Sequence, residues 1–485
     1  QGLKDANGRP IEEEWMEFDM DRQGFSQEYQ QLLDKIRRRT AVVGVIGLGY
    51  VGLPLASTFH SAGYFTIGFD ADLEVISALE RGQSYLEHLP NSTELFQQLS
   101  DSEKFHATSD MSRLKQVDAI LICVPTPLGE NFEPDLRYIE SCGRSIAAAR
   151  RAGQLVVLES TTYPGTTREK LLPWILEGGC ESSLGRDVFL AFSPEREDPG
   201  NKIHQMASIP KLVGGLDLPS SNLASALYES SFKQVIRVRS AEVAEAAKIV
   251  ENVYRSVNIA LVNELKMVLN KMNIDIWEVL DAAQTKPFGF HRFDPGPGWG
   301  GHCIPVDPFY LAWKARSVGV KSTFILRAGE INTQMPSYVV QHVQMALNDD
   351  KKPLNGSKIL LLGIAYKANI GDTRESPAFV IWKLLEESKA SVSYYDPLVP
   401  KIKGHLSSQF QFLKGRTGIP DDELPGELAT SDCVVVITPH SFFKQQDAVG
   451  GRQCIIQPAL QTYNGPVVDT RNWVPASWGL KVYKA

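Results

Sequence analysis

Short hydrophobic runs recur along the first half of the chain and alternate with segments of helical length. The runs occupy residues 41–46, 65–69, 119–124, 155–159 and 188–192. Each is rich in apolar residues and has the length of a buried strand. Strands that alternate with helices predict a parallel sheet that is covered by helices on both faces.

A different pattern begins at residue 241 and continues to residue 272. Apolar residues recur there with helical spacing over a segment that is unusually long for a globular helix. We interpret this segment as a spine between two domains. It is also a natural surface for contacts between two copies of the chain.

A second α/β unit follows and resembles the first. It opens with an apolar run at residues 358–363, and a strand predicted at 391–395 ends in Asp396, just as the strand at 65–69 ends in Asp70. The sequence thus predicts an α/β protein with two Rossmann-like, doubly wound parallel-sheet domains, joined by a long central helix and a helical middle domain. The expected parts are an N-terminal extension outside the core at 1–40 with a short amphipathic helix at 27–39, a first sheet domain at 41–240, a helical domain at 241–345 and a second sheet domain at 346–485.

Composition narrows the class of partner. The 485 residues are 43% hydrophobic and 22% charged, with a net charge of −7, so nothing in the overall charge favours nucleic acid or an anionic membrane. We see no signal peptide and no apolar run long enough to span a bilayer. The six cysteines show neither CxxC pairs nor metal-ligand spacing, which indicates a reducing, cytoplasmic compartment and no bound metal.

A glycine motif follows the first predicted strand. Gly47, Gly49 and Gly52 form a GxGxxG pattern that opens a helix, and Asp70 ends the next strand. The glycines allow a tight turn, a close approach of pyrophosphate and close helix–strand packing. An acid at Asp70 accepts hydrogen bonds from ribose hydroxyls and repels a 2′-phosphate, which favours NAD over NADP. The alternative is a glycine-rich turn in another kind of α/β sheet.

Polar residues follow three further predicted strands. Thr126 follows the strand at 119–124, Thr161 follows the strand that ends at Glu159, and Glu195 follows the strand at 188–192. Open α/β sheets bind ligands at the carboxyl ends of their strands. Taken alone, each residue is better explained by ordinary turn chemistry or by a solvated loop, which are the more common cases.

The long helix carries polar residues on one stripe. Lys248 and Asn252 lie one helical turn apart, and Asn263 lies about three turns farther along nearly the same face. Polar groups that a spine helix turns inward need partners. A solvated helix face is the alternative.

A cysteine lies in a loop of small residues at 295–307. Glycine and proline surround Cys303, and Asp307 follows it by four positions. A thiolate there can bond to a carbonyl carbon, which together with a dinucleotide site predicts oxidation of an alcohol past the aldehyde. Asp307 can pair with Lys248 or orient a water molecule, or it can serve as a helix cap. His302 can lower the thiol pKa, contact substrate or only shape the loop.

These motifs together resemble the UDP-glucose/GDP-mannose dehydrogenase family. The resemblance extends from about residue 42 to about residue 471, and chance agreement does not explain so many motifs in one order. It is carried by residues 47–54, 159–167, 193–195 and 371–377, by Lys248 and Asn252, and by the loop around Cys303.

The residues near the cysteine point to one branch of that family. Many glucose-specific members have a serine before the cysteine and a Lys-Asp pair after it, whereas this chain has His302 and Val306-Asp307. With residues 285–290 and 307–311, the loop resembles the branch that oxidises UDP-N-acetylhexosamines. This implies an NAD-dependent, four-electron oxidation of the C6 hydroxyl of UDP-N-acetyl-D-glucosamine. UDP-glucose, UDP-N-acetylgalactosamine and UDP-N-acetylmannosamine are the alternative substrates.

The resemblance also implies roles for individual residues. Cys303 would form a thiohemiacetal and then a thioester. Lys248 and Asn252 would stabilise oxyanions, and Asp307 would act as a base or orient water. Glu195 and Thr161 would activate the water that releases the acid. Cofactor contacts would come from Gly47, Gly49, Tyr50, Val51, Gly52, Asp70, Thr126, Thr161 and Arg374. Substrate contacts would come from Glu195, Arg196, Lys248, Asn252, Arg255, Gly298, Gly300, Tyr366, Lys367 and Arg471.

Two other classes of protein remain as alternatives. A two-electron hydroxyacid dehydrogenase can also join a Rossmann domain to a helical one, but it needs neither the loop cysteine nor a second nucleotide-like domain. A non-catalytic nucleotide-sugar binding protein would bind without turnover. Under the favoured interpretation the partners are a UDP-sugar and a second copy of the chain, as a homodimer or a higher homo-oligomer.

Overall fold

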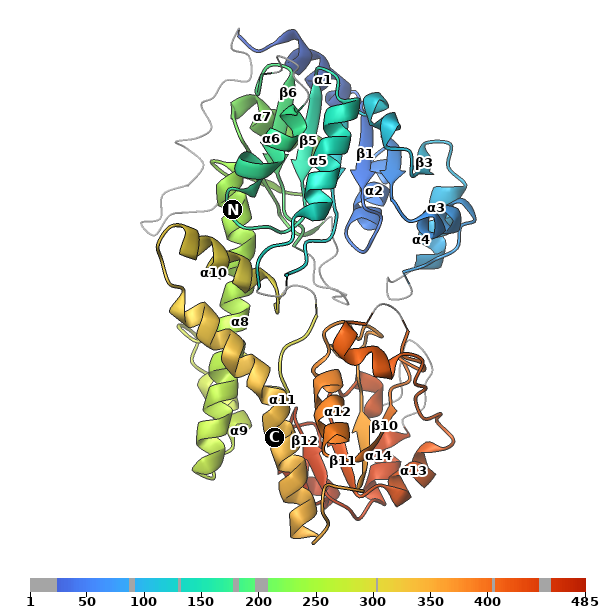
Figure 1. Ribbon diagram of the computed structural model, residues 1–485, viewed down its shortest axis with the longest axis vertical. Helices are drawn as coiled ribbons and strands as arrows, with labels where there is room; N and C mark the ends of the chain where they lie inside the picture. Colours follow the sequence, from blue (N-terminus) through green and yellow to red (C-terminus); the bar gives the residue numbers. More distant parts are fainter. Residues whose placement is uncertain are drawn as a thin grey trace.

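The computed structural model describes residues 24–86, 92–129, 132–177, 183–196, 208–301, 304–403, 406–444 and 455–485. Two sheets lie toward opposite ends of an elongated molecule, and long helices run along one side (Figure 1). Among the described residues, no helix combines the length and the apolar character needed to cross a bilayer.

The first sheet has the order β3-β2-β1-β4-β5-β6-β7-β8. Its strands are β1 (Val42–Ile46), β2 (Phe65–Phe69), β3 (Phe105–Thr108), β4 (Ala119–Ile122), β5 (Gln154–Leu158), β6 (Val188–Phe192), β7 (Lys211–Gly215) and β8 (Val235–Arg237). The five predicted strands are therefore confirmed. Its helices are α2 (Gly52–Ser61), α3 (Leu73–Glu80), α4 (Ser92–Ser100), α5 (Arg137–Ala149), α6 (Leu172–Leu176) and α7 (Leu218–Glu229).

The first sheet has one reversal of strand order and one change of strand direction. Strand β1 pairs in parallel with both β2 and β4, so the order of the strands reverses there. A ligand crevice is expected at the carboxyl ends of strands at such a point. The sheet is not parallel throughout, because β7 pairs antiparallel with β6 and parallel with β8.

The N-terminal helix differs from the expectation for residues 1–40. The amphipathic helix is present as α1 (Gln27–Arg37), but its apolar face is buried in the core rather than outside it. Tyr29 and Leu33 belong to the same hydrophobic cluster as Phe189 of β6 and Tyr228 of α7. Burial of this apolar face explains why the segment joins the first domain.

The predicted spine is confirmed as α8 (Ala241–Lys271), a helix of 31 residues. It packs against β6 and β7 in the first domain and against α11 (Thr323–Asp349). Helix α11 in turn packs against α12 (Pro377–Glu387) of the second domain. The middle region also contains α9 (Ile276–Ala283) and α10 (Asp307–Ser317).

The second sheet has the order β10-β9-β11-β12-β13, and all its pairs are parallel. Its strands are β9 (Lys358–Leu362), β10 (Ser391–Tyr395), β11 (Cys433–Val436), β12 (Val467–Asp469) and β13 (Val482–Lys484), with the helices α13 (Leu424–Thr430) and α14 (Ile456–Gln461). The predicted similarity of the two sheet domains includes an equivalent hydrogen bond made by an aspartate in each. Asp396 accepts from the N–H of Ile364 at 2.8 Å, and Asp70 accepts from the N–H of Leu48 at the same distance.

Candidate active site

The glycine loop lies at the carboxyl end of β1 and fits a dinucleotide. Gly47 has φ +90°, and a Cβ on Gly52 would lie 1.7 Å from the carbonyl oxygen of Gly47. Only glycine permits this turn and this packing of α2 on β1. A Cβ on Gly49 would meet nothing within 4 Å, so the space over the loop is open. Tyr50 and Val51 complete the turn into α2, with Val51 as its N-cap residue.

Asp70 is fixed at the end of β2 beside this loop. One carboxylate oxygen accepts from the N–H of Leu48, and the other accepts from the N–H of Asp72 at 3.0 Å. The carbonyl oxygen of Leu48 also accepts from the Tyr85 hydroxyl at 2.6 Å. These bonds hold an acid at the place where a Rossmann domain binds the adenosine ribose.

Arg374 connects the second sheet domain to the glycine loop. Its guanidinium carbon lies 4.3 Å from the centroid of the Tyr50 ring. The same guanidinium binds Asp372, with Nε 2.8 Å from Oδ2. The pKa of Arg374 is raised: burial opposes the charge, but the bond to Asp372 more than offsets it. A residue of the second domain thus lies at the predicted cofactor site of the first.

The structure brings together the polar residues of α8 and the start of α10. The Asn252 side chain donates to Oδ2 of Asp307 at 2.6 Å, and Lys248 lies one turn away on α8. All three residues are buried. Burial raises the pKa of Asp307 to about 6, although the Lys248 ammonium and the Asn252 amide act in the opposite direction. Asp307 is the first residue of α10 and not its cap, which is Val306.

Asn263 has a different place from Lys248 and Asn252. Its amide donates to Asn332 at 2.9 Å, and its carbonyl oxygen accepts from the N–H of Gly296 at 2.9 Å. It therefore ties the loop that leads to the cysteine onto α8 and α11. His302 and Cys303 themselves lie outside the described residues.

Glu195 belongs to a buried charge network. The Lys211 ammonium lies 2.6 Å from Glu159 and 3.3 Å from Glu195, and the Tyr228 hydroxyl donates to Glu159. Burial raises the pKa of Glu159. Burial opposes the charge of Lys211, but the two carboxylates raise its pKa. Sequence reasoning missed Lys211 and Tyr228, although a lysine at the head of the apolar run 211–215 was a usable signal.

The threonines at the strand ends are joined to each other. Thr126 Oγ1 donates to the carbonyl oxygen of Thr161 at 2.8 Å, which connects the segments that follow β4 and β5. The Tyr310 hydroxyl of α10 donates to the carbonyl oxygen of Thr126. This chain of contacts links the first domain to the helix that Asp307 begins.

Arg196 and Arg255, two of the predicted substrate contacts, differ in their surroundings. Arg196 binds Glu251 of α8 at 2.5 Å and the carbonyl oxygen of Pro210 at 2.9 Å. Arg255 is exposed on α8. Arg196 thus fastens the Glu195 segment to α8, and this side of the site is held by an ion pair.

Residues of the second domain line the loop at 296–301. A Cβ on Gly300 or Gly301 would lie about 3 Å from the Tyr366 side chain, and one on Gly296 would lie 2.5 Å from Nη1 of Arg471. Gly298 has φ +132°. Gly301 donates to the carbonyl oxygen of Arg374 at 3.2 Å. Tyr366, its neighbour Lys367 and Arg471 therefore belong to the segments that approach the cysteine loop.

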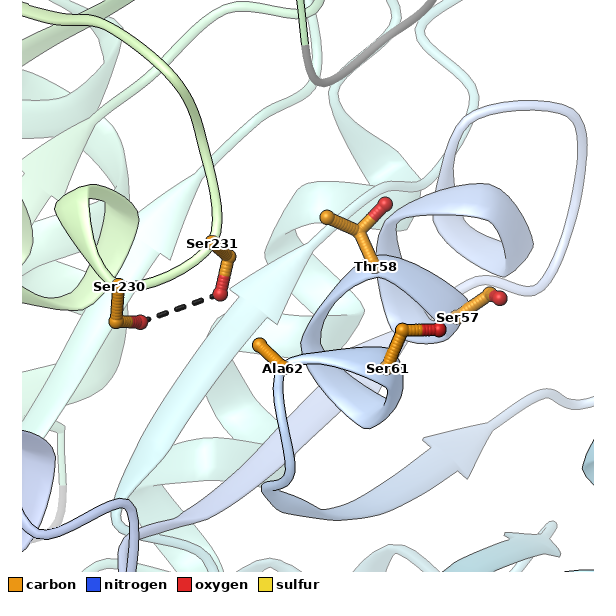
Figure 2. A pocket seen from close by; sticks show the side chains of 6 residues that line it. All are labelled: Ser57, Thr58, Ser61, Ala62, Ser230 and Ser231. Atoms are coloured by element: carbon orange, nitrogen blue, oxygen red, sulfur yellow. Dashed lines mark hydrogen bonds between the residues drawn. The ribbon is translucent and has the colours of Figure 1, made fainter.

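A separate hollow lies between the end of α2 and the segment that follows α7. It has a volume of about 390 Å³ and is lined by Ser57, Thr58, Ser61, Ala62, Ser230 and Ser231. Figure 2 shows these side chains on the second half of α2 and just after α7. Since α2 begins at the carboxyl end of β1, this hollow is away from the strand ends that carry the predicted site.

Comparison with known proteins agrees with this geometry. The chain matches the NAD-binding, central and UDP-binding domains of the UDP-glucose/GDP-mannose dehydrogenase family at residues 41–232, 242–334 and 360–475. It is 32% identical over 450 residues to a UDP-N-acetyl-D-mannosamine dehydrogenase of Methanococcus maripaludis, which covers 90% of this chain and 96% of that protein. It is 36% identical over 363 residues to a UDP-N-acetyl-D-glucosamine 6-dehydrogenase of Pseudomonas aeruginosa, which covers 74% of this chain and 83% of that protein.

The solved structures agree with the sequence relatives. The structure of a UDP-D-ManNAc dehydrogenase from Pyrococcus horikoshii superposes with a TM-score of 0.76 at 30% identity, and the match covers 91% of this chain and 98% of that chain. All three domains of the family match, in the order in which they occur along the chain. The chain belongs to the UDP-glucose/GDP-mannose dehydrogenase family and is an NAD-dependent UDP-sugar dehydrogenase.

Proposed function

We propose that the chain oxidises the C6 hydroxyl of UDP-N-acetyl-D-glucosamine to a carboxylate, with UDP-N-acetylglucosaminuronic acid as the product. The observation that carries the chemistry is the buried group of Lys248, Asn252 and Asp307, because Asp307 follows Cys303 by four residues. The choice of sugar is supported by the relatives of Pseudomonas aeruginosa and Salmonella typhi that are named UDP-N-acetyl-D-glucosamine 6-dehydrogenase.

The first oxidation converts the C6 alcohol to an aldehyde. The hydroxyl loses its proton, and C6 loses a hydride; bound NAD supplies the hydride acceptor for this step and for the second oxidation. The Lys248 ammonium and the Asn252 amide stabilise the oxyanion that forms on the sugar. Both groups are buried, which strengthens such an interaction because water does not screen it.

The second stage retains the aldehyde on the enzyme. The Cys303 sulfur adds to the aldehyde carbon and forms a thiohemiacetal. Loss of a second hydride and of the hydroxyl proton leaves a thioester. Water then attacks the thioester carbon, the C–S bond breaks, and the carboxylate and the thiol are released. In total, one alcohol, one water and two NAD+ give one carboxylate, two NADH and three protons.

Glu195 and Asp307 have different roles in the handling of water and protons. Glu195 and Thr161 position the water that attacks the thioester. The ion pair with Lys211 holds the Glu195 carboxylate in place. Asp307 accepts a proton or orients a water beside Lys248. An acid with its pKa raised to about 6 suits this role near neutral pH.

The two nucleotides are assigned to different domains. Gly47, Gly49, Gly52 and Asp70 bind the cofactor, with Tyr50, Val51, Thr126 and Arg374 at its edge. Tyr366, Lys367 and Arg471 bind the uridine diphosphate, where positive side chains neutralise the phosphates. Arg196, Arg255, Gly298 and Gly300 complete the substrate contacts.

We also propose a cytoplasmic homodimer or higher homo-oligomer that forms through α8. Several large apolar side chains are exposed along this helix, among them Val250, Leu261, Leu265 and Val268. A second copy of the same helix is a suitable cover for such a face. Cys142 and Cys433 are free and buried, in keeping with a reducing compartment.

The test of the substrate is a panel of UDP-sugars incubated with NAD, with NADH absorbance and identification of the acid. We expect the highest kcat/KM with UDP-N-acetyl-D-glucosamine. A clear preference for UDP-N-acetylmannosamine, UDP-N-acetylgalactosamine or UDP-glucose would replace the sugar but retain the chemistry. Binding of all four sugars without NADH formation would favour a non-catalytic binding protein.

A further inference from the structure

Lys266 of α8 is a buried lysine that the reaction described above does not use. It is only 3% exposed, and its ammonium has no hydrogen-bond partner among the described residues. It lies one turn beyond Asn263, which fixes Gly296. An unpaired ammonium that is withdrawn from water is costly, so such a group calls for an explanation.

The surroundings of Lys266 combine an aromatic ring with a second cation. Its ammonium lies 5.8 Å from the centroid of the Tyr338 ring on α11. Burial and the charge of Arg471 lower the pKa of Lys266 to about 7, and Asp469 acts weakly in the other direction. Arg471 and Asp469 belong to the carboxyl end of β12, where a Rossmann-like sheet binds ligands.

Arg471 also lies at this junction, and its side chain is close to the cysteine loop. Its Nη1 would be 2.5 Å from a Cβ on Gly296, so the guanidinium rests against the backbone of the loop that Asn263 holds. Burial lowers the pKa of Arg471, and the charges of Asp294 and Asp469 act in the opposite direction. Two cations therefore face one junction of α8, the cysteine loop and β12.

We infer that Lys266 is a further substrate-binding residue, which together with Arg471 binds the phosphate oxygens of the nucleoside diphosphate. This inference rests on the proposed binding of a UDP-sugar by the second domain. An anion at the junction would pair both cations and remove the cost of burying the ammonium. The alternative is that Lys266 is a neutral amine that only packs on Tyr338.

The test is calorimetric binding of UDP and of uridine, without turnover, to the full-length protein and to Lys266→Met. We expect the variant to bind UDP about tenfold or more weakly and to bind uridine almost as well as the parent does. Lys271→Met is the matched control, because Lys271 is exposed on the same helix; its UDP affinity should not change. Since no oxidation is measured, the result does not depend on the sugar or on Cys303.

Two outcomes would overturn the inference. One is an unchanged UDP affinity in folded Lys266→Met, which would leave Lys266 a packing residue. The other is an equal loss of UDP and uridine affinity, which would place Lys266 away from the phosphates. If the methionine variant does not fold, Lys266→Arg supplies the readout: it keeps the charge and should retain UDP affinity within about threefold, and a larger loss for uridine than for UDP would contradict the assignment. Failure of UDP to bind the parent protein would instead contradict the proposed function.

Discussion

The side chain of Asn252 donates a hydrogen bond of 2.6 Å to Asp307, although 55 positions separate them in the sequence. The bond joins the inner face of α8 to the first residue of α10. Because Asp307 follows Cys303 by four residues, the bond also fixes the point at which the cysteine loop joins α10.

This bond gives a pH-dependent prediction. The Asn252 amide binds the ionised carboxylate and so lowers the pKa of Asp307, against burial that raises it to about 6. If the ionised form acts, kcat falls as pH falls through about 6. In Asn252→Ala, which loses the bond, we expect the acid limb to move to higher pH, in addition to a lower kcat. The pH profile of kcat measures this shift.

The control for this experiment is Asn258→Ala, because Asn258 lies on the same helix and its side chain donates to the backbone carbonyl oxygen of Tyr254. Its acid limb should match that of the parent. An unchanged limb in Asn252→Ala, or a retained limb in Asp307→Asn, would show that another group titrates.

The contact of Arg374 with Tyr50 predicts a link between the second domain and cofactor affinity. An Arg–aromatic contact contributes on the order of 0.5–2 kcal/mol, so Arg374→Ala should weaken NAD binding by about two- to thirtyfold. Arg416→Ala is the matched control, because Arg416 lies over Trp382, within the second domain. NAD titration by fluorescence checks both variants. Equal NAD affinities in Arg374→Ala and Arg416→Ala would contradict the link.

Asp70 is predicted to serve the cofactor and not the sugar. Asp70→Ala should lose the ribose contact and the bond to Leu48, so the dissociation constant of NAD should rise more than that of UDP. Asp72→Ala controls for local loosening, because it removes the side chain that caps α3 and retains the backbone N–H that binds Asp70. Separate titrations of NAD and UDP distinguish the two effects, and parallel losses of both ligands in Asp70→Ala would reject the assignment.

The buried Lys211 predicts a large stability effect. Lys211→Met leaves Glu159 and Glu195 without their shared cation, and breaking a buried pair from one side costs about 3–5 kcal/mol. The pKa of Glu159, already raised by burial, should rise further. An acid with a raised folded pKa loses stability as pH rises, so the variant should be less destabilised at pH 5 than at pH 8.

Urea unfolding at both pH values measures this effect. The double variant with Glu159→Gln should recover part of the lost free energy of unfolding, because it removes the unpaired acid. A Lys211→Met protein as stable as the parent at pH 8 would contradict the claim that the Lys211 cation stabilises the fold by pairing with Glu159 and Glu195.

The sequence predicted what depends on local patterns. The GxGxxG turn, Asp70 at the end of β2 and the helix at 241–272 all follow from spacing within one segment, and the structure confirms their places. The burial of α1 and the antiparallel pairing of β7 with β6 depend on contacts between separate segments, which periodicity does not record.

The same distinction applies to the site. Lys248 and Asn252 were predicted to share a face because they lie one turn apart, but their meeting with Asp307 depends on how α10 packs against α8. Lys211 and Lys266 were missed because their chemistry arises from burial beside Glu159 and Arg471, respectively. A lysine at the head of an apolar run, such as Lys211, can signal its own burial, but the sequence does not reveal the partner that it meets.

The central claim is that one sulfur atom holds the half-oxidised sugar for a second oxidation. The most direct measurement is the number of NADH molecules formed for each UDP-sugar consumed by the parent protein, with Cys303→Ala assayed beside it. We predict two NADH for each sugar in the parent, and in the variant no acid together with nearly unchanged UDP binding. A yield of one NADH in the parent, or normal acid formation by Cys303→Ala, would contradict the account.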